Sequence, residues 1–494
     1  MHERWNFIVN LKLSVIAWSI SIVGVLSFPL MVNAAPQAAM AQPDSHAKQL
    51  AQLIDAALAN DAVRKQYFAQ SQAIQETGMA SSTLMDPKIK VGFGGLPIDS
   101  FKFDEDPMTN ISVGLMQQFE RGSSLALQAK KAKQQASGVA LQVDLRELEV
   151  ANSMTQLWLE LGYQQRAERI VRANQTLMRE LAGFIETNYS LGKSEAQDLL
   201  QAQLQVSKLD EKLQANQQMQ QRIVSQLSEW LGSAWLVEQP MLTAEESVNW
   251  SRLDAQLATV NGSTTHYALL VTHPMVGMAE TAIHTNQTQV EIAQTAYQPQ
   301  FGVEVMYAYR QASSMQGGPA ADMVSAYLTM DIPLFTGSRQ DRNHAAAQYQ
   351  VGAAKSQRDV LLAQMNAKVN ALLVDKMNLE QRLSRYQTTL LTQAKARTQA
   401  VERGYENNTS QFNDVVSAAS DELALQLEQV RLMTDLNLTK SNLAYLLNGF
   451  DFQVIAPSLT SVETLTSLET LTSLETLTSL ETLTSLETLT PVEK

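Results

Sequence analysis

The chain has 494 residues, which is enough to bury a sizeable core, and its formal net charge is −13. This acidic balance argues against nucleic acid as a partner. The sequence contains no cysteine, which excludes disulfides, thiolate metal ligands, a catalytic thiol and an acylated amino-terminal cysteine.

Residues 1–34 have the pattern of an export signal. Arg4 and Lys12 precede an apolar run over 13–31, and small residues suited to cleavage follow it. A second small-residue site lies at 39–41, and the run is also long enough to be an uncleaved anchor. No later apolar stretch approaches twenty residues. The sequence therefore predicts either a soluble exported protein or an outer-membrane β-barrel.

An internal duplication organises the rest of the chain. Residues 119–231 match residues 335–447 at a constant offset of 216. The matched landmarks are Phe119 with Phe335, Tyr189 with Tyr405, and Asp198 with Asp414. Self-similarity of this kind indicates a duplicated structural unit of roughly two hundred residues.

Each copy is predicted to contain a helix, a β-hairpin and then long helices. Neither long run contains proline, which costs about 3 kcal/mol inside a helix. Hairpins are expected at about 88–119 and 300–335, and long helices over 122–232 and 338–448. The expected segments are a first repeat at 35–232, a linker at 233–265, a second repeat at 266–448, and a tail of six-residue repeats at 449–494.

The hairpins show the two-residue alternation of strands with one apolar face. In residues 301–310 the odd positions are apolar, while Glu304 and Arg310 lie on the other face. In residues 323–334, Thr329 and Asp331 oppose an apolar set in the same way. The first hairpin alternates more weakly. A soluble antiparallel sheet packed on the helices is the alternative to a membrane sheet.

Four strands cannot close a membrane barrel alone, because such barrels begin at about eight strands and an open edge leaves backbone groups unpaired in lipid. Membrane strands therefore require a closed oligomer. A trimer would share one twelve-stranded barrel, with four strands per chain. Glu304, Arg310, Thr329 and Asp331 would then face its lumen, while Phe119 and Phe335 would mark an interfacial aromatic girdle.

The long helices resemble a coiled coil. A helix from Gly122 to Tyr189 would reach about 100 Å. In the second run, apolar residues recur every seven positions from Met365 to Tyr386. A second set lies four positions after the first, and Lys376 is its one polar member. A coiled-coil rod without a channel would show the same pattern.

Two helix-turn-helix tips share a motif in which an aromatic residue precedes a glycine-like turn position and an aspartate. Residues 189–198 carry Tyr189, Gly192 and Asp198. Residues 405–414 carry Tyr405, Asn408 and Asp414, with asparagine in place of glycine. Asparagine tolerates the left-handed conformation, so the turn is expected in both copies.

With these motifs and this element order, the chain resembles TolC-type outer-membrane efflux ducts over the mature sequence to about Asn448. The resemblance implies a mainly α trimer whose β-barrel continues into a long α-helical barrel in the periplasm of a Gram-negative bacterium. It implies an equatorial belt at 233–265. Docking of a periplasmic adaptor is expected at the tips, at Tyr189, Gly192, Lys193, Tyr405, Asn408 and Ser410.

The segment 94–101 and its surroundings resemble the sequences of one subgroup of these ducts, which accompanies heavy-metal resistance-nodulation-division pumps. The implied function is a passive exit duct, with metal cations as expected cargo and outer-membrane lipid, an adaptor and an inner-membrane pump as partners. Drug efflux and type I protein secretion use the same duct architecture. A periplasmic coiled-coil adaptor is the alternative function from another class of protein. Adaptors, however, have one helical hairpin where this chain is predicted to have two.

The tip aspartates are candidates for a cation-selective mouth. Three copies each of Asp198 and Asp414 would concentrate negative potential at a narrow aperture. Each aspartate alone is also a residue favoured at a helix start. The histidines lack metal-ligand spacing, and the sequence contains no nucleophile elbow, phosphate loop or dinucleotide fingerprint. Neither a cofactor nor an enzymatic activity is predicted.

Overall fold

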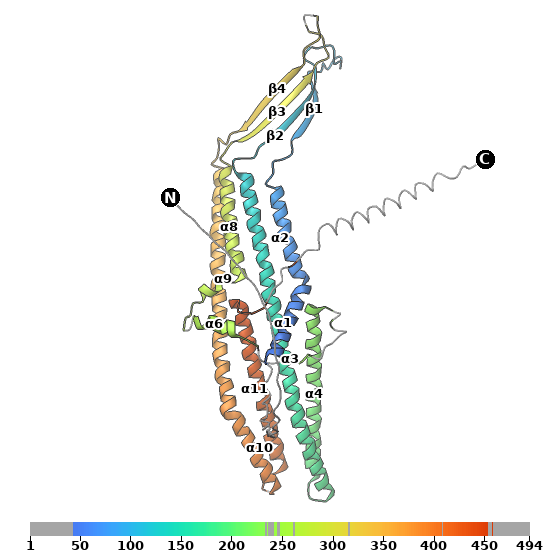
Figure 1. The fold of residues 1–494 in the computed structure, drawn as a ribbon, viewed down its shortest axis with the longest axis vertical. Helices are drawn as coiled ribbons and strands as arrows, with labels where there is room; N and C mark the ends of the chain where they lie inside the picture. The colour runs from blue at the N-terminus through green and yellow to red at the C-terminus, as the bar shows by residue number, and fades with distance from the viewer. Residues whose placement is uncertain are drawn as a thin grey trace, which may run out of the picture. The chain divides into compact units, whose positions relative to one another are not determined.

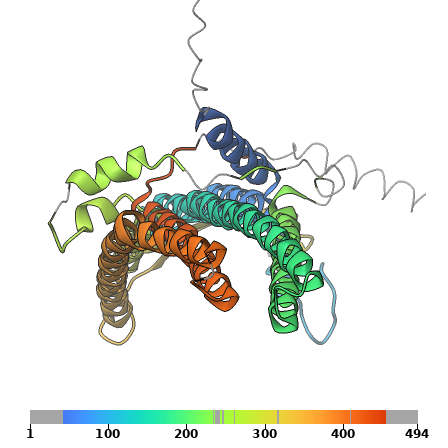
Figure 2. The ribbon, with the colours of Figure 1, turned by 90° about the horizontal axis from the view of Figure 1, so that it is seen from below.

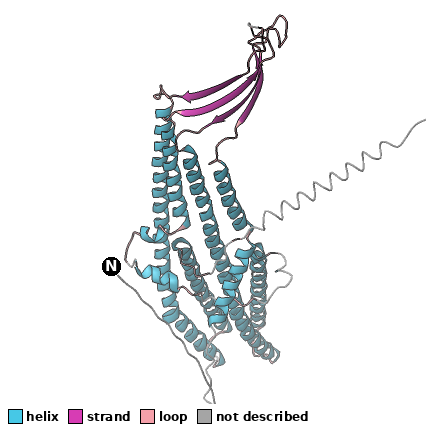
Figure 3. Ribbon diagram, turned by 45° about the horizontal axis from the view of Figure 1, so that its top comes forward, coloured by secondary structure: helices cyan, strands magenta, loops and turns pink. Residues whose placement is uncertain are grey.

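The computed structural model describes residues 43–232, 235, 242–244, 248–259, 262–314, 317–407, 409–452 and 457. Their elements are mainly helical, with one four-stranded antiparallel sheet (Figure 3). The described residues from Asp44 onward belong to one compact unit. The predicted export signal lies outside the described residues, and so does the repetitive part of the tail.

The elements follow the predicted order in both copies. The first copy consists of α1 (Pro43–Asn60), α2 (Ala62–Ala80), β1 (Lys88–Gly94), β2 (Asn110–Gln118), α3 (Ser124–Ser190) and α4 (Ala196–Leu231). After α6 (Ser251–Thr259) in the linker, the second copy consists of α7 (Tyr267–Leu270), α8 (Pro274–Thr295), β3 (Gln300–Tyr309), β4 (Met323–Asp331), α9 (Gln340–Arg385), η1 (Tyr386–Leu390), α10 (Leu391–Glu406) and α11 (Phe412–Leu447).

The duplication is visible in the element boundaries. Helix α4 and helix α11 each have 36 residues and begin 216 positions apart, at Ala196 and Phe412. Helix α3 has 67 residues, about 100 Å at 1.5 Å per residue. Its counterpart occupies the same length in three consecutive elements of 46, 5 and 16 residues. The middle element is a π-helix, an interruption that the proline-free pattern did not predict.

The helices lie side by side in an order that matches the strands. Near the sheet, the order is α2, α3, α8 and α9, and the strand order is β1, β2, β3 and β4 (Figure 1). In the half away from the sheet, α4 packs on α3, α3 on α11, and α11 on α9 and α10. Figure 2 shows these helices as a curved layer. Helices α3 and α9 therefore run through both halves.

The largest core cluster lies where the two halves of the helical layer meet. Trp158 and Met154 of α3, Leu227 of α4 and Leu443 of α11 are almost fully buried there. Met365 and Val369, which begin the predicted seam of α9, belong to the same cluster. Farther along, Leu379 and Tyr386 are only half-buried.

Among the helices of the described residues, none combines the length and apolar character that a membrane crossing requires.

Candidate functional site: a two-faced sheet and two helical tips

The strand register joins the predicted apolar residues of all four strands into one face. Val91 pairs with Val113, Val113 with Tyr307, and Tyr307 with Val324, so these side chains form one row across the sheet. They share a face because side chains alternate along a strand. Val91 and Val324, at the two edges, are 69% and 73% exposed. Contiguous apolar surface of this extent marks a site of association with lipid or protein.

The opposite face carries most of the polar side chains of the sheet, together with Met116, Met306 and Tyr327, and it bears an ion pair across the two copies. The Lys90 Nζ atom lies 3.2 Å from the Glu304 Oε1 atom. The two residues are 214 positions apart. Thr329 pairs with Gly302, whose missing side chain leaves room beside it. Glu304 and Thr329 therefore lie on the face that the sequence assigned to a lumen.

The remaining two predicted lumen residues lie at the ends of the sheet. Asp331 ends β4 and forms an ion pair with Arg121, which precedes α3. Arg310 follows the last residue of β3, and its Nε and Nη1 atoms donate to the carbonyl oxygens of Ala321 and Pro107 at 2.7 and 3.3 Å. Arg310 thus ties the two hairpin loops together at the rim, where its guanidinium has carbonyl partners.

The sheet ends in two edge strands, β1 and β4, which pair on one side only. Unpaired backbone groups on an edge strand are a template for another strand. β1 has 7 residues, fewer than the other three strands, because the chain turns at Gly95, whose φ is +65°. An apolar face, a polar face and two open edges are the parts from which several copies could close a barrel.

The first helical tip is a tight turn between α3 and α4. Gly192 has a φ of +71°, the left-handed conformation that favours glycine. The backbone N–H of Lys193 donates to the carbonyl oxygen of Asn188 at 2.8 Å, which closes the end of α3. Asp198 lies in the first turn of α4 and is half-buried. Tyr189 remains exposed.

The second tip repeats this turn. The N–H of Thr409 donates to the carbonyl oxygen of Gly404 at 2.7 Å, a bond that corresponds to the Lys193 contact 216 positions earlier. Asn408 lies outside the described residues, so its predicted left-handed conformation stays a prediction. Ser410 is packed against Gly404, where an added Cβ would lie 2.2 Å from the Ser410 Oγ atom.

Asp414 has a structural task at this tip. Its Oδ2 atom accepts the backbone N–H of Gln411 at 3.1 Å, and the Gln411 side chain accepts an N–H in return, which forms a capping box at the start of α11. The helix-start role is therefore real for Asp414. No such side-chain cap joins Glu195 to α4 at the first tip. Asp414 remains exposed, so its charge also faces solvent.

The two tips pack against each other. A small core joins Ile185 of α3 and Ala202 of α4 to Phe412 and Val416 of α11. The Tyr405 ring packs on Phe412, with the ring centroids 6.1 Å apart. This contact holds the helix starts that carry Asp198 and Asp414 in one cluster of hairpin ends.

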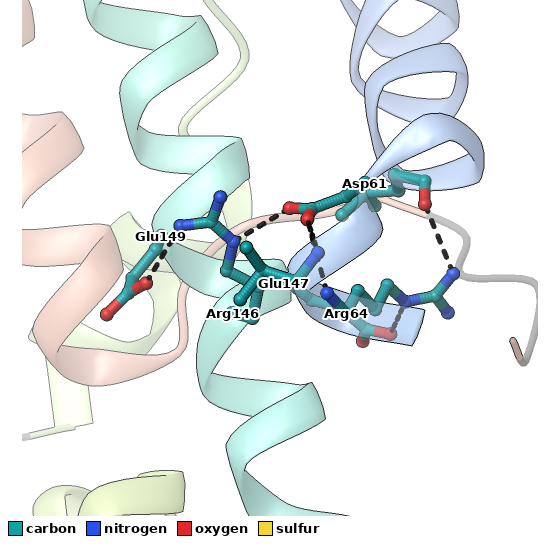
Figure 4. A network of polar contacts seen from close by, with 7 residues as sticks. Asp61, Arg64, Arg146, Glu147 and Glu149 are labelled. Atoms are coloured by element: carbon teal, nitrogen blue, oxygen red, sulfur yellow. Dashed lines mark hydrogen bonds and ion pairs between the residues drawn. The ribbon is translucent and has the colours of Figure 1, made fainter. Parts of the chain in front are cut away.

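A buried polar network fixes the start of α2 onto α3 (Figure 4). The Arg64 Nε atom lies 2.6 Å from Glu147 Oε1, and the Arg146 Nε atom lies 2.7 Å from Asp61 Oδ2. Asp61 also caps α2 by accepting the N–H groups of Val63 and Arg64. Burial raises the pKa of the Glu147 carboxyl, although the Arg64 hydrogen bond opposes that shift.

His273 corresponds in the second copy to Asp61, because each is the N-cap residue of the helix that leads to a hairpin. Its Nδ1 atom accepts the N–H of Met275 at 3.2 Å. Burial lowers the pKa of His273 to about 4, so the imidazole is neutral at physiological pH. Across the described ranges, no three His, Cys, Asp or Glu side chains are grouped closely enough to hold a metal ion.

Residues 265–449 match the family model described as Outer membrane efflux protein. No match is found among curated protein sequences. Solved structures match over most of the chain. VceC from Vibrio cholerae is similar with a TM-score of 0.66 at 15% identity, over 82% of this chain and 97% of that chain.

Two further solved structures are similar to this chain over most of its length. CusC, whose structures concern transmembrane channel formation, has a TM-score of 0.66 at 15% identity over 81% of this chain and 92% of its own. The open outer membrane channel MtrE from Neisseria gonorrhoeae has a TM-score of 0.61 at 13% identity, over 83% of this chain and 91% of its own. The chain has the TolC-like fold of these channels, and its second repeat carries the sequence pattern of the outer membrane efflux protein family.

Proposed function

We propose that this chain forms the outer-membrane exit duct of a tripartite efflux system. Three copies would close one twelve-stranded barrel by pairing β4 of each chain with β1 of the next. The observation that carries the proposal is the exposed apolar face that runs through all four strands opposite a polar face. In a closed barrel the apolar face meets lipid, and the polar face lines a water-filled lumen.

The helices extend this duct into the periplasm. Because the order of the upper helices follows the order of the strands, closure of the sheet also closes the helical layer into a second barrel. The hairpin tips would then surround the periplasmic mouth. A periplasmic adaptor would dock there, at the surfaces around Tyr189, Lys193 and Ser410, and would join the duct to an inner-membrane pump of the resistance-nodulation-division type.

Neutralising the two tip aspartates should reduce the cation selectivity of the resting channel. Asp198→Asn with Asp414→Asn removes six carboxylates from a trimer, and each charge contributes to the negative potential at the mouth. Asparagine is the better replacement because its side-chain oxygen can still accept the Gln411 N–H of the capping box, a bond that alanine at position 414 would lose. The measurement is single-channel conductance in planar bilayers, with the cation-to-anion permeability ratio and block by an added trivalent cation.

The matched control is Asp210→Asn with Asp421→Asn, which removes as many charges from the same two hairpins but away from their tips, where Asp210 of α4 pairs with Arg179 of α3 at 2.9 Å. Asp421 of α11 pairs with Arg397 of α10 at 2.6 Å, and both side chains are exposed. Unchanged selectivity and block in the tip variant would show that Asp198 and Asp414 serve only as helix-start residues.

The exported substrate is expected to be a heavy-metal cation, as the resemblance of segment 94–101 to the metal-pump subgroup implies. Deletion of the gene should then sensitise the host to metal salts more than to dyes, detergents or antibiotics. The reverse order of sensitivities would favour drug efflux, and loss of a secreted protein without either phenotype would favour type I secretion. Complementation by the intact chain is the control.

A further inference from the structure

The loop between β1 and β2, residues 95–109, presents apolar side chains beyond the end of the strands. It lies at the end of the sheet away from the helices (Figure 1). Ile98 and Phe101 are 83% and 67% exposed. Phe101 also has a φ of +53°, a left-handed conformation that is a genuine outlier for a bulky residue. Its backbone N–H donates to the carbonyl oxygen of Pro97 at 3.0 Å, so a hydrogen-bonded turn holds this strained residue.

The loop continues the apolar face of the sheet. The Phe103 ring meets the Phe93 ring edge-on, with the centroids 5.9 Å apart. Phe93 is the last apolar residue of β1, in a row with Ile111 and Tyr309 on the exposed face. Phe103 therefore contacts a residue of that face. At the base of the loop, the buried Thr109 donates its hydroxyl to the Gly95 carbonyl oxygen at 2.8 Å and holds the two ends together.

We propose that this loop is a lipid anchor whose Ile98 and Phe101 side chains enter the acyl-chain boundary of the outer leaflet. The inference rests on the proposed function, because it assumes that the apolar face of the sheet contacts lipid. Aromatic side chains collect at this depth in membrane proteins, where the ring is shielded and the backbone stays hydrated.

The charges of the loop decide which part of the lipid it meets. Asp99, Asp104, Glu105 and Asp106 oppose a single lysine, Lys102. This balance disfavours binding to anionic headgroups, so the occupant is the hydrocarbon of the acyl chains. The Phe101 ring is available for this role, because no other aromatic ring among the described residues packs on it.

The test uses single cysteines, since the chain has none of its own. An environment-sensitive fluorophore is attached to the intact channel at Phe101→Cys and, as a second position free of backbone strain, at Ile98→Cys. Val305→Cys reports on the face of the sheet, and Ser313→Cys reports on an exposed site of the β3–β4 loop. Each protein is reconstituted into phosphatidylcholine vesicles that contain lipid spin-labelled either near the top or near the end of the acyl chain, and iodide serves as the aqueous quencher.

The proposal predicts that the spin-labelled lipid quenches the fluorophores at positions 98, 101 and 305. The fluorophore at position 313 should be quenched by iodide alone. Quenching of positions 98 and 101 by iodide alone, with position 305 still quenched by lipid, would overturn the anchor and leave the membrane sheet intact. Protection of positions 98 and 101 from both quenchers would assign the loop to a neighbouring chain and would also overturn it. Absence of lipid quenching at position 305 would refute the proposed function itself.

Discussion

Replacing Leu328 by arginine should abolish most of the assembled channel in the outer membrane. Leu328 is 72% exposed on the apolar face of β4, and it pairs with Val303 near the middle of the sheet. An arginine on the lipid face near the midplane costs about 2 to 4 kcal/mol in each chain, and three chains carry it in a trimer. The measurement is the yield of oligomer extracted from outer membranes.

Thr329→Arg is the matched control, one residue along the same strand. Its side chain faces the polar side and lies beside Gly302, which leaves space for a longer side chain. The yield of this variant should remain close to that of the unmodified chain. Equal losses for both variants would mean that the two faces of the sheet are equivalent and that the lipid-facing assignment is wrong.

Replacing Arg64 by methionine should destabilise the helical part by about 3 to 5 kcal/mol, because removal of one partner leaves a buried charge uncompensated. The Arg64 side chain is 4% exposed and its Glu147 partner 12%. Arg172→Met is the control, since the Arg172 side chain is 54% exposed in its i,i+4 pair with Glu168 and such a surface pair contributes about 0 to 1 kcal/mol. The check is the thermal midpoint of helical circular dichroism in detergent.

The loss of folding stability in the Arg64→Met variant should depend on pH in a defined direction. Burial already raises the pKa of Glu147, and removal of Arg64 eliminates the contacts that lower it. A folded-state pKa above the unfolded value means that stability falls as pH rises through the folded pKa. The variant should therefore be closest to the unmodified protein under acidic conditions and farthest from it at neutral pH. A loss that grows on acidification would contradict the assignment to Glu147.

Periodic features of this fold were predictable from the sequence. Alternation placed Val305 and Thr329 on opposite faces, and the duplication placed the starts of α4 and α11 at matching positions. Such features repeat every two residues or recur at one offset, so a single chain displays them directly. The element order and the two tip motifs carried the resemblance to TolC-type ducts from which the fold was predicted.

Long-range polar contacts were not predictable in this way. Arg64 and Glu147 are 83 positions apart, and Lys90 and Glu304 are 214 apart. No periodicity links such partners, and each residue alone resembles an ordinary surface charge. The π-helix at Tyr386–Leu390 was also missed, because its residues continue the apolar spacing of the preceding helix. The capping role of Asp414 depends on Gln411, which is not the serine or threonine of the usual capping box.

The number of chains per particle tests the shared barrel most directly. The described part of one chain supplies four strands with two open edges, and a lipid-embedded sheet must leave no edge unpaired. The measurement is the detergent-corrected mass of the purified protein, on the same preparation that conducts ions in planar bilayers. Three chains per conducting particle is the predicted result, and a monodisperse monomer that forms pores would contradict it.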